Sequence, residues 1–313
     1  MIRTFGRKLQ AVIRKVANFV WRLLRPVVEL VWGLLTYFYN VISPFFGPTL
    51  LLLFGISILV PFAWVIISSL KTSHEITGTP WALPEIAHFS NYVNAWTEGQ
   101  IGISFFNSLL VTIGTLAVLI PTGSMAAYVL VKYPFRGSRL ILNSFMGGLM
   151  FPNFLVIVPL YMLMAKLNML NTKTGLILVY VAYSLAFTVF VLSGFFEQLP
   201  NELIEASFLD GCSHSGCFWR VMFPLAKPGI LVVAIFNAIG LWNEYPLALV
   251  LAQTKNVQTL PIGIANLTQT QQYAGDWGAL FAGIVIVMLP VMIIYLIFKE
   301  QIQKTMLAGA LKG

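Results

Sequence analysis

A charge-free stretch at residues 174–196 reads TGLILVYVAYSLAFTVFVLSGFF, and a polar segment, EQLPNELIEASFLDGCSHSGCFWRVMFPLAKP, follows it at residues 197–228. An α-helix needs about 20 mostly apolar residues to cross the hydrocarbon core of a bilayer, and the first stretch meets that length. The second stretch carries the charges that the first one lacks. The pair predicts a membrane-spanning helix followed by a solvated loop.

The composition extends this interpretation to all 313 residues. Hydrophobic residues make up 58% of the chain and charged residues only 10%, where soluble domains carry about 25% charged residues. So few charges cannot cover a water-soluble surface, which excludes a globular soluble enzyme. The basic residues behind the net charge of +8 lie between apolar runs. This placement is typical of charges that orient a membrane protein, rather than of a nucleic-acid-binding face.

Charged residues divide the chain into six expected spans, and the protein is predicted to be all-α. With six spans, 15 of the 19 basic residues lie on the cytoplasmic side together with both termini. A seventh span at about 27–43 would reverse that excess, so the positive-inside rule favours six. The expected spans are residues 46–70, 103–131, 140–165, 175–196, 229–251 and 278–298.

Residues before the first span predict a separate N-terminal segment, 1–45, ahead of a six-span membrane body at 46–298 and a cytoplasmic tail at 299–313. Residues 2–25 place apolar side chains on one face of a helix and seven basic side chains on the other. Such a basic amphipathic helix is expected to lie in the headgroup plane of the bilayer as an anchor. A docking arm for a partner is the alternative interpretation.

Helix breakers interrupt three of the spans. A proline inside a helix frees a backbone carbonyl, which is tolerated at membrane depth only against protein or water. Broken helices line many transport pathways, but proline also serves as a simple packing kink. The breakers are Pro121 and Gly123 in the second span, Pro152, Asn153 and Pro159 in the third, and Pro246 in the fifth.

Glu244 is the only charged residue within a span, in the sequence Leu241-Trp242-Asn243-Glu244-Tyr245-Pro246. A carboxylate there costs about 3 kcal/mol on insertion scales, so it is expected to face a water-filled cavity or a partner. One interpretation is a pathway position with substrate hydroxyls bonded to Asn243 or Glu244. The other is an interhelical hydrogen bond, or a position nearer the outer interface. The candidate pathway residues are Asn153, Trp242, Asn243, Glu244 and Tyr245.

The polar segment after the fourth span predicts a helix-turn-helix. Pro200 opens the first helix and Gly211 ends it in a left-handed cap. Ser213 can cap a second helix, which is expected to stop before Pro224. Leu203, Ile204 and Phe208 give the first helix an apolar stripe beside acidic residues, a pattern suited to a groove on a soluble partner.

The loop also contains Cys212 and Cys217. A zinc site would need more soft ligands than the chain places nearby. We therefore expect no metal site, and two reduced cysteines that pack as small side chains.

Residues 197–224, called the coupling loop below, resemble the signature loop of ABC importer permeases. That pattern is Glu-Ala-Ala, three residues, Gly, nine residues, Ile-x-Leu-Pro. Here it reads Glu205-Ala206-Ser207, three residues, Gly211, nine residues, Val221-Met222-Phe223-Pro224. Asp210, and three motifs nearer the C-terminus, are similar to the carbohydrate branch with its maltose-type permeases. These motifs are residues 242–245, residues 259–261 with 276–279, and residues 309–313.

The resemblance implies a bacterial inner-membrane subunit that imports a sugar by alternating access. Its expected partners are a second permease, two cytoplasmic ATPase subunits, an external solute-binding protein and the lipid bilayer, but no nucleic acid. The chain lacks a Gly-x-x-x-x-Gly-Lys-Ser/Thr loop, so it is expected to bind no cofactor, with ATP and Mg²⁺ used by the partner ATPase. The implied ATPase contacts are Glu205, Ala206, Ser207, Asp210, Gly211 and Pro224.

Other functions remain open at this point. The same machinery could import a polyol, a glycerophospho compound or another small solute. An ion-coupled secondary carrier would need a chain of ionisable groups within the membrane, and the sequence offers only Glu244. A membrane-embedded enzyme would need a paired nucleophile and base or a metal motif within the spans, and the sequence shows none.

Overall fold

The computed structural model describes the backbone of residues 2–310. It describes side chains within residues 21–301, except 22–23, 35, 41–43, 153 and 271–274. All regular structure in this part of the chain is helical, without a strand, as the sequence predicts. The chain forms two compact units, Met1–Trp64 and Val65–Gly313.

The first unit lies within one helix, α1 (Ile2–Ser68), which continues through Pro26, Pro44, Pro48 and Pro61. Its part Pro44–Ser68 is long and apolar enough to cross a membrane, close to the predicted first span. The two faces predicted for residues 2–25 fall almost entirely on side chains outside the described set.

The second unit is a bundle of long and short helices. The first half contains α2 (Ser73–Gly78), α3 (Ser90–Thr97), α4 (Ile101–Lys132), α5 (Ser138–Leu149), the 3₁₀ turn η1 (Asn153–Val156), α6 (Ile157–Lys166) and α7 (Lys173–Gln198). The second half contains α8 (Glu202–Leu209), α9 (His214–Cys217), the π-helical turn η2 (Phe218–Met222), α10 (Phe223–Leu225), α11 (Lys227–Trp242), α12 (Pro246–Leu251), α13 (Leu260–Ala274) and α14 (Trp277–Ala310).

Among the described residues, four helices are long and apolar enough to cross a membrane, or up to six if each bent pair counts as one span. The four are in α1, α4, α7 and α14, close to the first, second, fourth and sixth predicted spans. The third predicted span is bent by 96° between α5 and α6. The fifth is interrupted between Trp242, the end of α11, and Pro246, the start of α12, where the sequence places its helix breaker. The second bent pair is His214–Leu225 with Lys227–Trp242, at 73°.

By contrast, the predicted break at Pro121 and Gly123 is wrong, because α4 runs unbroken through both. The hydroxyl of Thr122 donates to the carbonyl of Val118 at 2.7 Å, one turn earlier. Gly123 serves packing instead, since an added Cβ there would lie 2.6 Å from Cγ2 of Thr188 on α7. Thr188 is fully buried and accepts a hydrogen bond from Asn237 of α11 at 3.0 Å. Close contact between α4 and α7, rather than a kink, explains this glycine.

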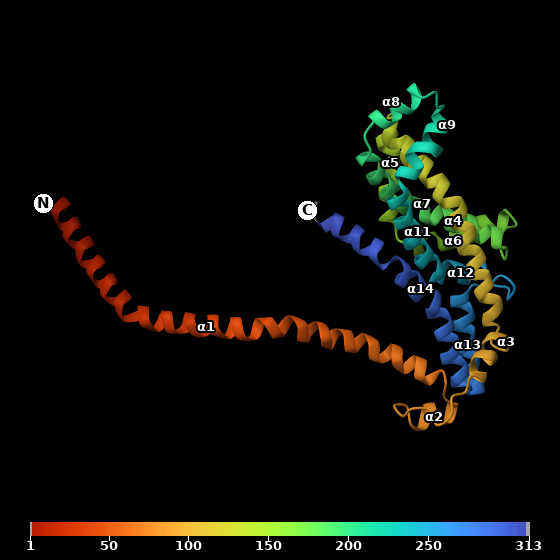
Figure 1. The fold of residues 1–313 in the computed structure, drawn as a ribbon, viewed down its shortest axis with the longest axis horizontal. Coiled ribbons are helices and arrows are strands. Elements are labelled where there is room, and N and C mark those ends of the chain that lie inside the picture. The colour runs from red at the N-terminus through yellow and green to blue at the C-terminus, as the bar shows by residue number, and fades with distance from the viewer. Residues whose placement is uncertain (1, 311–313) are drawn as a thin grey trace. The chain divides into compact units, whose positions relative to one another are not determined.

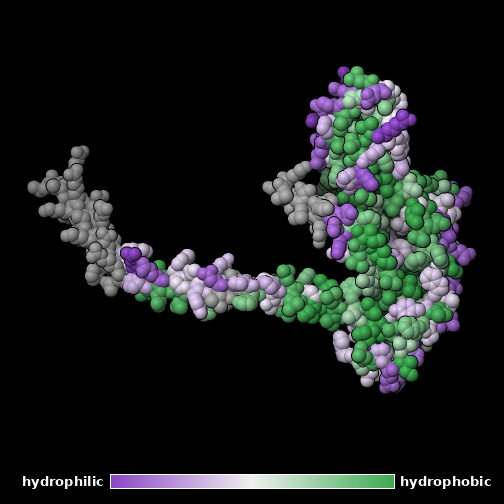
Figure 2. Space-filling view, in the orientation of Figure 1, coloured by the Kyte–Doolittle hydropathy of each residue, from purple (hydrophilic) through white to green (hydrophobic). Residues whose placement is uncertain are grey.

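The coupling loop lies at one end of the second unit, and α2 with the start of α14 lies at the other (Figure 1). Figure 2 shows mostly hydrophobic side chains between these ends and more hydrophilic ones over the coupling loop. This distribution is the one expected for a bundle that crosses a bilayer.

The end away from the coupling loop is held by polar contacts. The ammonium group of fully buried Lys71 donates to the carbonyls of Thr79 (3.0 Å) and Pro80 (3.2 Å). Glu75 accepts backbone hydrogen bonds from Thr72 and Glu85, and these bonds lower the pKa of Glu75 to about 2. The backbone N–H of Trp277 donates to the hydroxyl of Ser73 at 3.0 Å, which ties this segment to the start of α14.

The α4–α7 contact generates a stability prediction. The change Gly123→Ala presses the new Cβ against Thr188, which the hydrogen bond from Asn237 holds in place. Overpacking of this kind costs about 1–3 kcal/mol. We expect a lower midpoint of thermal unfolding in detergent. The matched control is Gly194→Ala on α7, where an added Cβ meets open space and the midpoint should stay or rise slightly. Equal midpoints for both variants would contradict tight packing at Gly123.

Candidate functional site

Two helix interruptions meet at one cavity within the bundle. The cavity, called the break cavity below, has a volume of about 240 Å³. One wall contains Phe154 and Ile157, which follow the bend after α5, and another contains residues 243–247, between α11 and α12. Irregular backbone at membrane depth is tolerated where it lines a cavity or is buried in protein. The two interruptions therefore satisfy this condition at the same place.

Glu244 holds the second interruption together. Its carboxylate accepts the backbone N–H of Leu247 at 2.8 Å and that of Ala248 at 3.0 Å, in the first turn of α12. Those donors have no partner within their own helix, and a negative group at a helix N-terminus is also favoured electrostatically. The hydroxyl of Tyr180, fully buried on α7, donates to the same carboxylate at 2.5 Å. The interhelical hydrogen bond considered from sequence is therefore present.

Glu244 also lines the break cavity, beside Asn243 and Tyr245. The side-chain amide of Asn243 donates to the carbonyl of Ile239 at 2.8 Å, which leaves its oxygen for other partners. Gly240 lines the same cavity, and an added Cβ there would meet nothing within 4 Å. The structural and pathway interpretations of Glu244 are thus compatible, because one carboxylate caps α12 and borders the cavity.

The remaining candidate pathway residues are Trp242 and Asn153, and the structure gives a different result for each. Trp242 is buried, packs edge-on against Phe105 at 5.4 Å and donates from its indole nitrogen to the carbonyl of Val287 on α14. Trp242 thus connects α11 to α4 and α14, and it does not line the break cavity. Asn153 begins η1, next to Phe154 of the cavity wall, but its side chain lies outside the described residues.

The coupling loop has the helix-turn-helix form that its sequence predicts. Helix α8 begins at Glu202, two residues after Pro200, and Gly211 has a φ of 81°, in the left-handed region. The hydroxyl of Ser213 accepts the backbone N–H of Gly216 at 3.2 Å and caps α9. The predicted stop before Pro224 is wrong, because the π-helical turn η2 leads into α10, where Pro224 sits in the first turn. Proline is tolerated there because it has no N–H to leave unpaired.

The loop presents one face and buries the other. Glu205, Ala206, Asp210, Gly211 and Pro224 are exposed, as contacts with a partner require. Ser207 is buried and its hydroxyl donates to the carbonyl of Ile204 at 2.7 Å, so it stabilises α8 rather than forming a surface contact.

The apolar stripe predicted for α8 does not face outward as a unit. Ile204 is buried in the chain's own core, and Leu203 is half-buried. Leu209 is 90% exposed and is the most prominent apolar side chain of the loop. A leucine left in water on a projecting loop gains about 1.5–3 kcal/mol when a partner covers it.

The inner face of the loop packs on α4 and α7 around Tyr128. Its ring contacts Phe196 of α7 at 5.6 Å and Phe218 of η2 at 5.2 Å. Its hydroxyl lies 3.7 Å from the sulfur of Cys217, which is buried and unpaired with another cysteine. The loop is therefore packed directly against both spans.

A polar contact adds to this attachment. The ammonium group of Lys132, at the end of α4, donates to the carbonyl of Leu199 at 2.5 Å and to the side-chain oxygen of Asn201 at 2.8 Å. The side chain of Lys132 thus ties the C-terminal end of α4 to the start of the coupling loop.

Sequence reasoning missed two residues of these sites. Tyr180 lies in an apolar span, and its partnership with Glu244 joins positions 64 residues apart. Leu209 follows the apolar stripe directly, but helical periodicity does not show which of its leucines the body covers. The sequence signal in each case was weak, because both assignments depend on neighbours that tertiary packing supplies.

Comparisons with known proteins agree with this geometry. A family model described as "Binding-protein-dependent transport system inner membrane component" matches residues 119–307. The diacetylchitobiose uptake system permease protein NgcG of Streptomyces coelicolor is 42% identical over 263 residues, which cover 84% of this chain and 87% of that protein. The trehalose transport system permease protein SugB of Mycobacterium tuberculosis is 31% identical, over 82% of this chain and 93% of its own.

A solved structure shares the fold. It is a crystal structure of a bacterial ABC transporter involved in the import of the acidic polysaccharide alginate. The matched chain superposes with a TM-score of 0.70 at 23% identity, over 83% of this chain and 96% of the other.

The Tyr180–Glu244 contact generates a prediction. The change Tyr180→Phe removes one of three donors to the carboxylate, and a hydrogen bond to a charged group contributes about 1.5–3 kcal/mol. We expect a lower thermal unfolding midpoint. In a Glu244→Ala background the same change should have little further effect, because contacting residues are not additive. The control is Tyr295→Phe, exposed on α14, and additive effects of the first two changes would disprove the contact.

Proposed function

From the premise that this chain belongs to the family of binding-protein-dependent transport system inner membrane components, we propose that it is the membrane-spanning subunit of an ATP-driven sugar importer. The chain is a transport subunit without catalysis of its own. The observation that carries the proposal is the coupling loop, whose outer face is exposed and whose inner face is packed on α4 and α7. A loop of this form transmits a partner's motion to the spans.

The mechanism follows from these contacts. An ATPase subunit covers Leu209 and the neighbouring acidic side chains, with Gly211 supplying the left-handed turn that ends α8. When two such subunits close on ATP and Mg²⁺, the loop moves and carries α4 and α7 through the Tyr128 contacts. Helix α7 also holds Glu244 through Tyr180. The same movement therefore closes the break cavity to one side of the membrane and opens it to the other.

The substrate is proposed to be a sugar or oligosaccharide. Relatives include proteins named for uptake of diacetylchitobiose and for transport of trehalose and sulfoquinovosyl glycerol. Hydroxyl groups of such solutes suit the oxygen of Asn243 and the carboxylate of Glu244, since both accept hydrogen bonds. Import of a polyol, a glycerophospho compound or another small solute is the second candidate, since one cavity-lining carboxylate and one amide do not distinguish sugars from other polyhydroxyl solutes.

The proposed assembly contains this chain, a second permease, two cytoplasmic ATPase subunits and an external solute-binding protein. The excess of basic residues supports cytoplasmic termini and a cytoplasmic coupling loop in the bacterial inner membrane. Residues 1–45 are proposed to lie on the membrane surface, 46–298 to form the permease body and 299–313 to form a cytoplasmic tail. ATP and Mg²⁺ belong to the partner ATPase.

The turn of the coupling loop provides the first test. A β-branched residue is strained at positive φ, so Gly211→Val should distort the turn and reduce the ATPase rate stimulated by sugar-loaded binding protein at least about tenfold. The control is Gly137→Val, at a glycine with φ of 97° before α5, where the added group also meets open space. The ATPase rate of the reconstituted complex checks the prediction. Full stimulation in Gly211→Val would refute docking at this loop.

The break cavity provides the second test. Gly240→Leu places a side chain into the 240 Å³ space, so sugar uptake into reconstituted vesicles should fall while the ATPase still co-purifies. Gly240→Ala should retain most uptake, because its single methyl group fits. Gly194→Leu on α7, also facing open space, controls for loss of a helical glycine. Normal uptake by Gly240→Leu would place the pathway elsewhere.

A further inference from the structure

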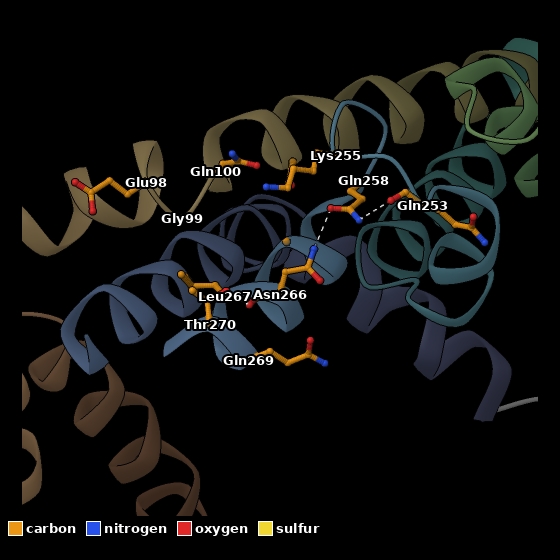
Figure 3. Close-up of a pocket in the computed structure, with 12 residues that line it drawn as sticks. Glu98, Gly99, Gln100, Gln253, Lys255, Gln258, Asn266, Leu267, Gln269 and Thr270 are labelled. Atoms are coloured by element: carbon orange, nitrogen blue, oxygen red, sulfur yellow. Dashed lines mark hydrogen bonds between the residues drawn. The ribbon is translucent and has the colours of Figure 1, made fainter. Parts of the chain in front are cut away.

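A cavity larger than the break cavity lies away from both the break cavity and the coupling loop. It has a volume of about 630 Å³ and lies between the start of α4, the loop at 252–259 and α13 (Figure 3). This space is called the entrance cup below. Its size falls in the range of roughly 300–1,000 Å³ that small-molecule sites occupy. The side chains that give it its chemistry are Gln100, Gln253, Gln258, Asn266, Gln269 and Thr270.

Five of these six side chains are carboxamides. A carboxamide offers two N–H donors and one carbonyl acceptor, and a sugar hydroxyl both donates and accepts. The lining also contains one acidic and one basic side chain, Glu98 and Lys255, so the charges of the cup are balanced. A balanced, amide-rich surface matches a neutral polyhydroxylated ligand better than an ion.

The wall of the cup is held in place before any ligand binds. The side-chain amide of buried Asn107, on α4, donates to the carbonyls of Asn256 and Gln258, each at 3.0 Å. The side-chain oxygen of Asn171 accepts the backbone N–H groups of Gln253 (2.7 Å) and Thr254 (3.0 Å). A loop fixed from both sides loses little further freedom on binding, which favours affinity.

Two amides of the cup are already oriented by hydrogen bonds, which Figure 3 shows. The side-chain amide of Gln258 donates to the backbone carbonyl of Gln253 at 3.1 Å, and that of Asn266 donates to the side-chain oxygen of Gln258 at 2.9 Å. These bonds orient Gln258 and Asn266 while using only part of their capacity. Among the described residues, the side chains of Gln100 and Gln269 have no protein partner, so their donors and acceptors are available to a ligand.

The floor depends on a close approach of two helices. An added Cβ at Gly263 of α13 would lie 2.7 Å from the hydroxyl oxygen of Ser104 on α4. Both residues line the cup. The glycine lets α13 lie directly against α4, and the side chains around that contact form a concave rather than a flat surface.

We propose that the entrance cup is a carbohydrate-binding site for neutral mono- and disaccharides, distinct from the break cavity. It lies at the end of the bundle opposite the coupling loop (Figure 1), which is the external end under the proposed function on which this inference rests. A sugar bound there occupies the external mouth of the transporter before it reaches the break cavity.

The test measures sugar binding to the complete transporter in nanodiscs, without its binding protein. The probes are glucose, N-acetylglucosamine, trehalose and N,N′-diacetylchitobiose. Saturation-transfer NMR detects the binding of each probe. We expect at least one probe to bind, and Asn266→Ala/Gln269→Ala to weaken it about tenfold through lost hydrogen bonds. The single change Gln269→Ala breaks no described protein contact, so its smaller loss separates ligand binding from folding.

The matched control is Asn168→Gly, an exposed carboxamide of another loop whose φ of 53° glycine adopts without strain. It should bind the probe as the unmodified complex does. No binding by any probe, or equal binding by the cup variants, would overturn the proposal.

A further measurement separates a sugar site from a protein-docking site. The affinity of the complex for the sugar-loaded binding protein should be unchanged by Gln269→Ala. A fall in that affinity with unaltered sugar binding would make the cup a docking surface and refute the inference. The proposed function fails independently, if sugar-loaded binding protein does not stimulate the ATPase of the unmodified complex.

Discussion

Every backbone polar group within a membrane needs a hydrogen-bond partner, and the structure depends on this requirement. Glu244 supplies the partners where the fifth span is interrupted, at the start of α12. The chain interrupts its fifth span after Trp242 and begins α12 at Pro246. That start would leave backbone donors unpaired in an apolar setting, and the Glu244 carboxylate accepts two of them. The third donor, Tyr180, comes from α7. One acidic side chain thus stabilises the interruption and ties it to a neighbouring span, beside a cavity that is lined by both apolar and polar side chains.

Helix α7 connects the two ends of the proposed mechanism. Phe196, near its end, packs against Tyr128 beneath the coupling loop, and Tyr180, sixteen positions earlier, holds Glu244 at the break cavity. At 1.5 Å per residue these positions are about 24 Å apart along one unbroken helix. Close packing of α4 on α7 at Gly123 and Thr188 stiffens the connection. Because packed interfaces of this kind move as units rather than deform gradually, α4 and α7 are the elements through which the proposed displacement of the loop would reach the cavity.

Asparagine side chains perform at the opposite end the role that Glu244 performs inside. Asn107 and Asn171 hold the loop at 252–259 through its backbone groups, and the loop then presents its own amides to the entrance cup. Buried Lys71 similarly uses its ammonium group on backbone carbonyls. Side chains that satisfy backbone groups hold these irregular segments in place without regular secondary structure, including the loop that lines the entrance cup.

The sequence by itself determined the helical class, the approximate positions of the membrane spans and the turn at Gly211, because apolar length and backbone preference are local properties. It also identified Glu244 as unusual, since one charge in an apolar run is visible without a structure. Only the tertiary structure decided that Pro121 leaves α4 intact, that Ser207 is buried while Leu209 is exposed, and that Tyr180 is the partner of Glu244. Those outcomes depend on which neighbour lies within a few ångströms, and the helices that supply the neighbours are distant in the chain.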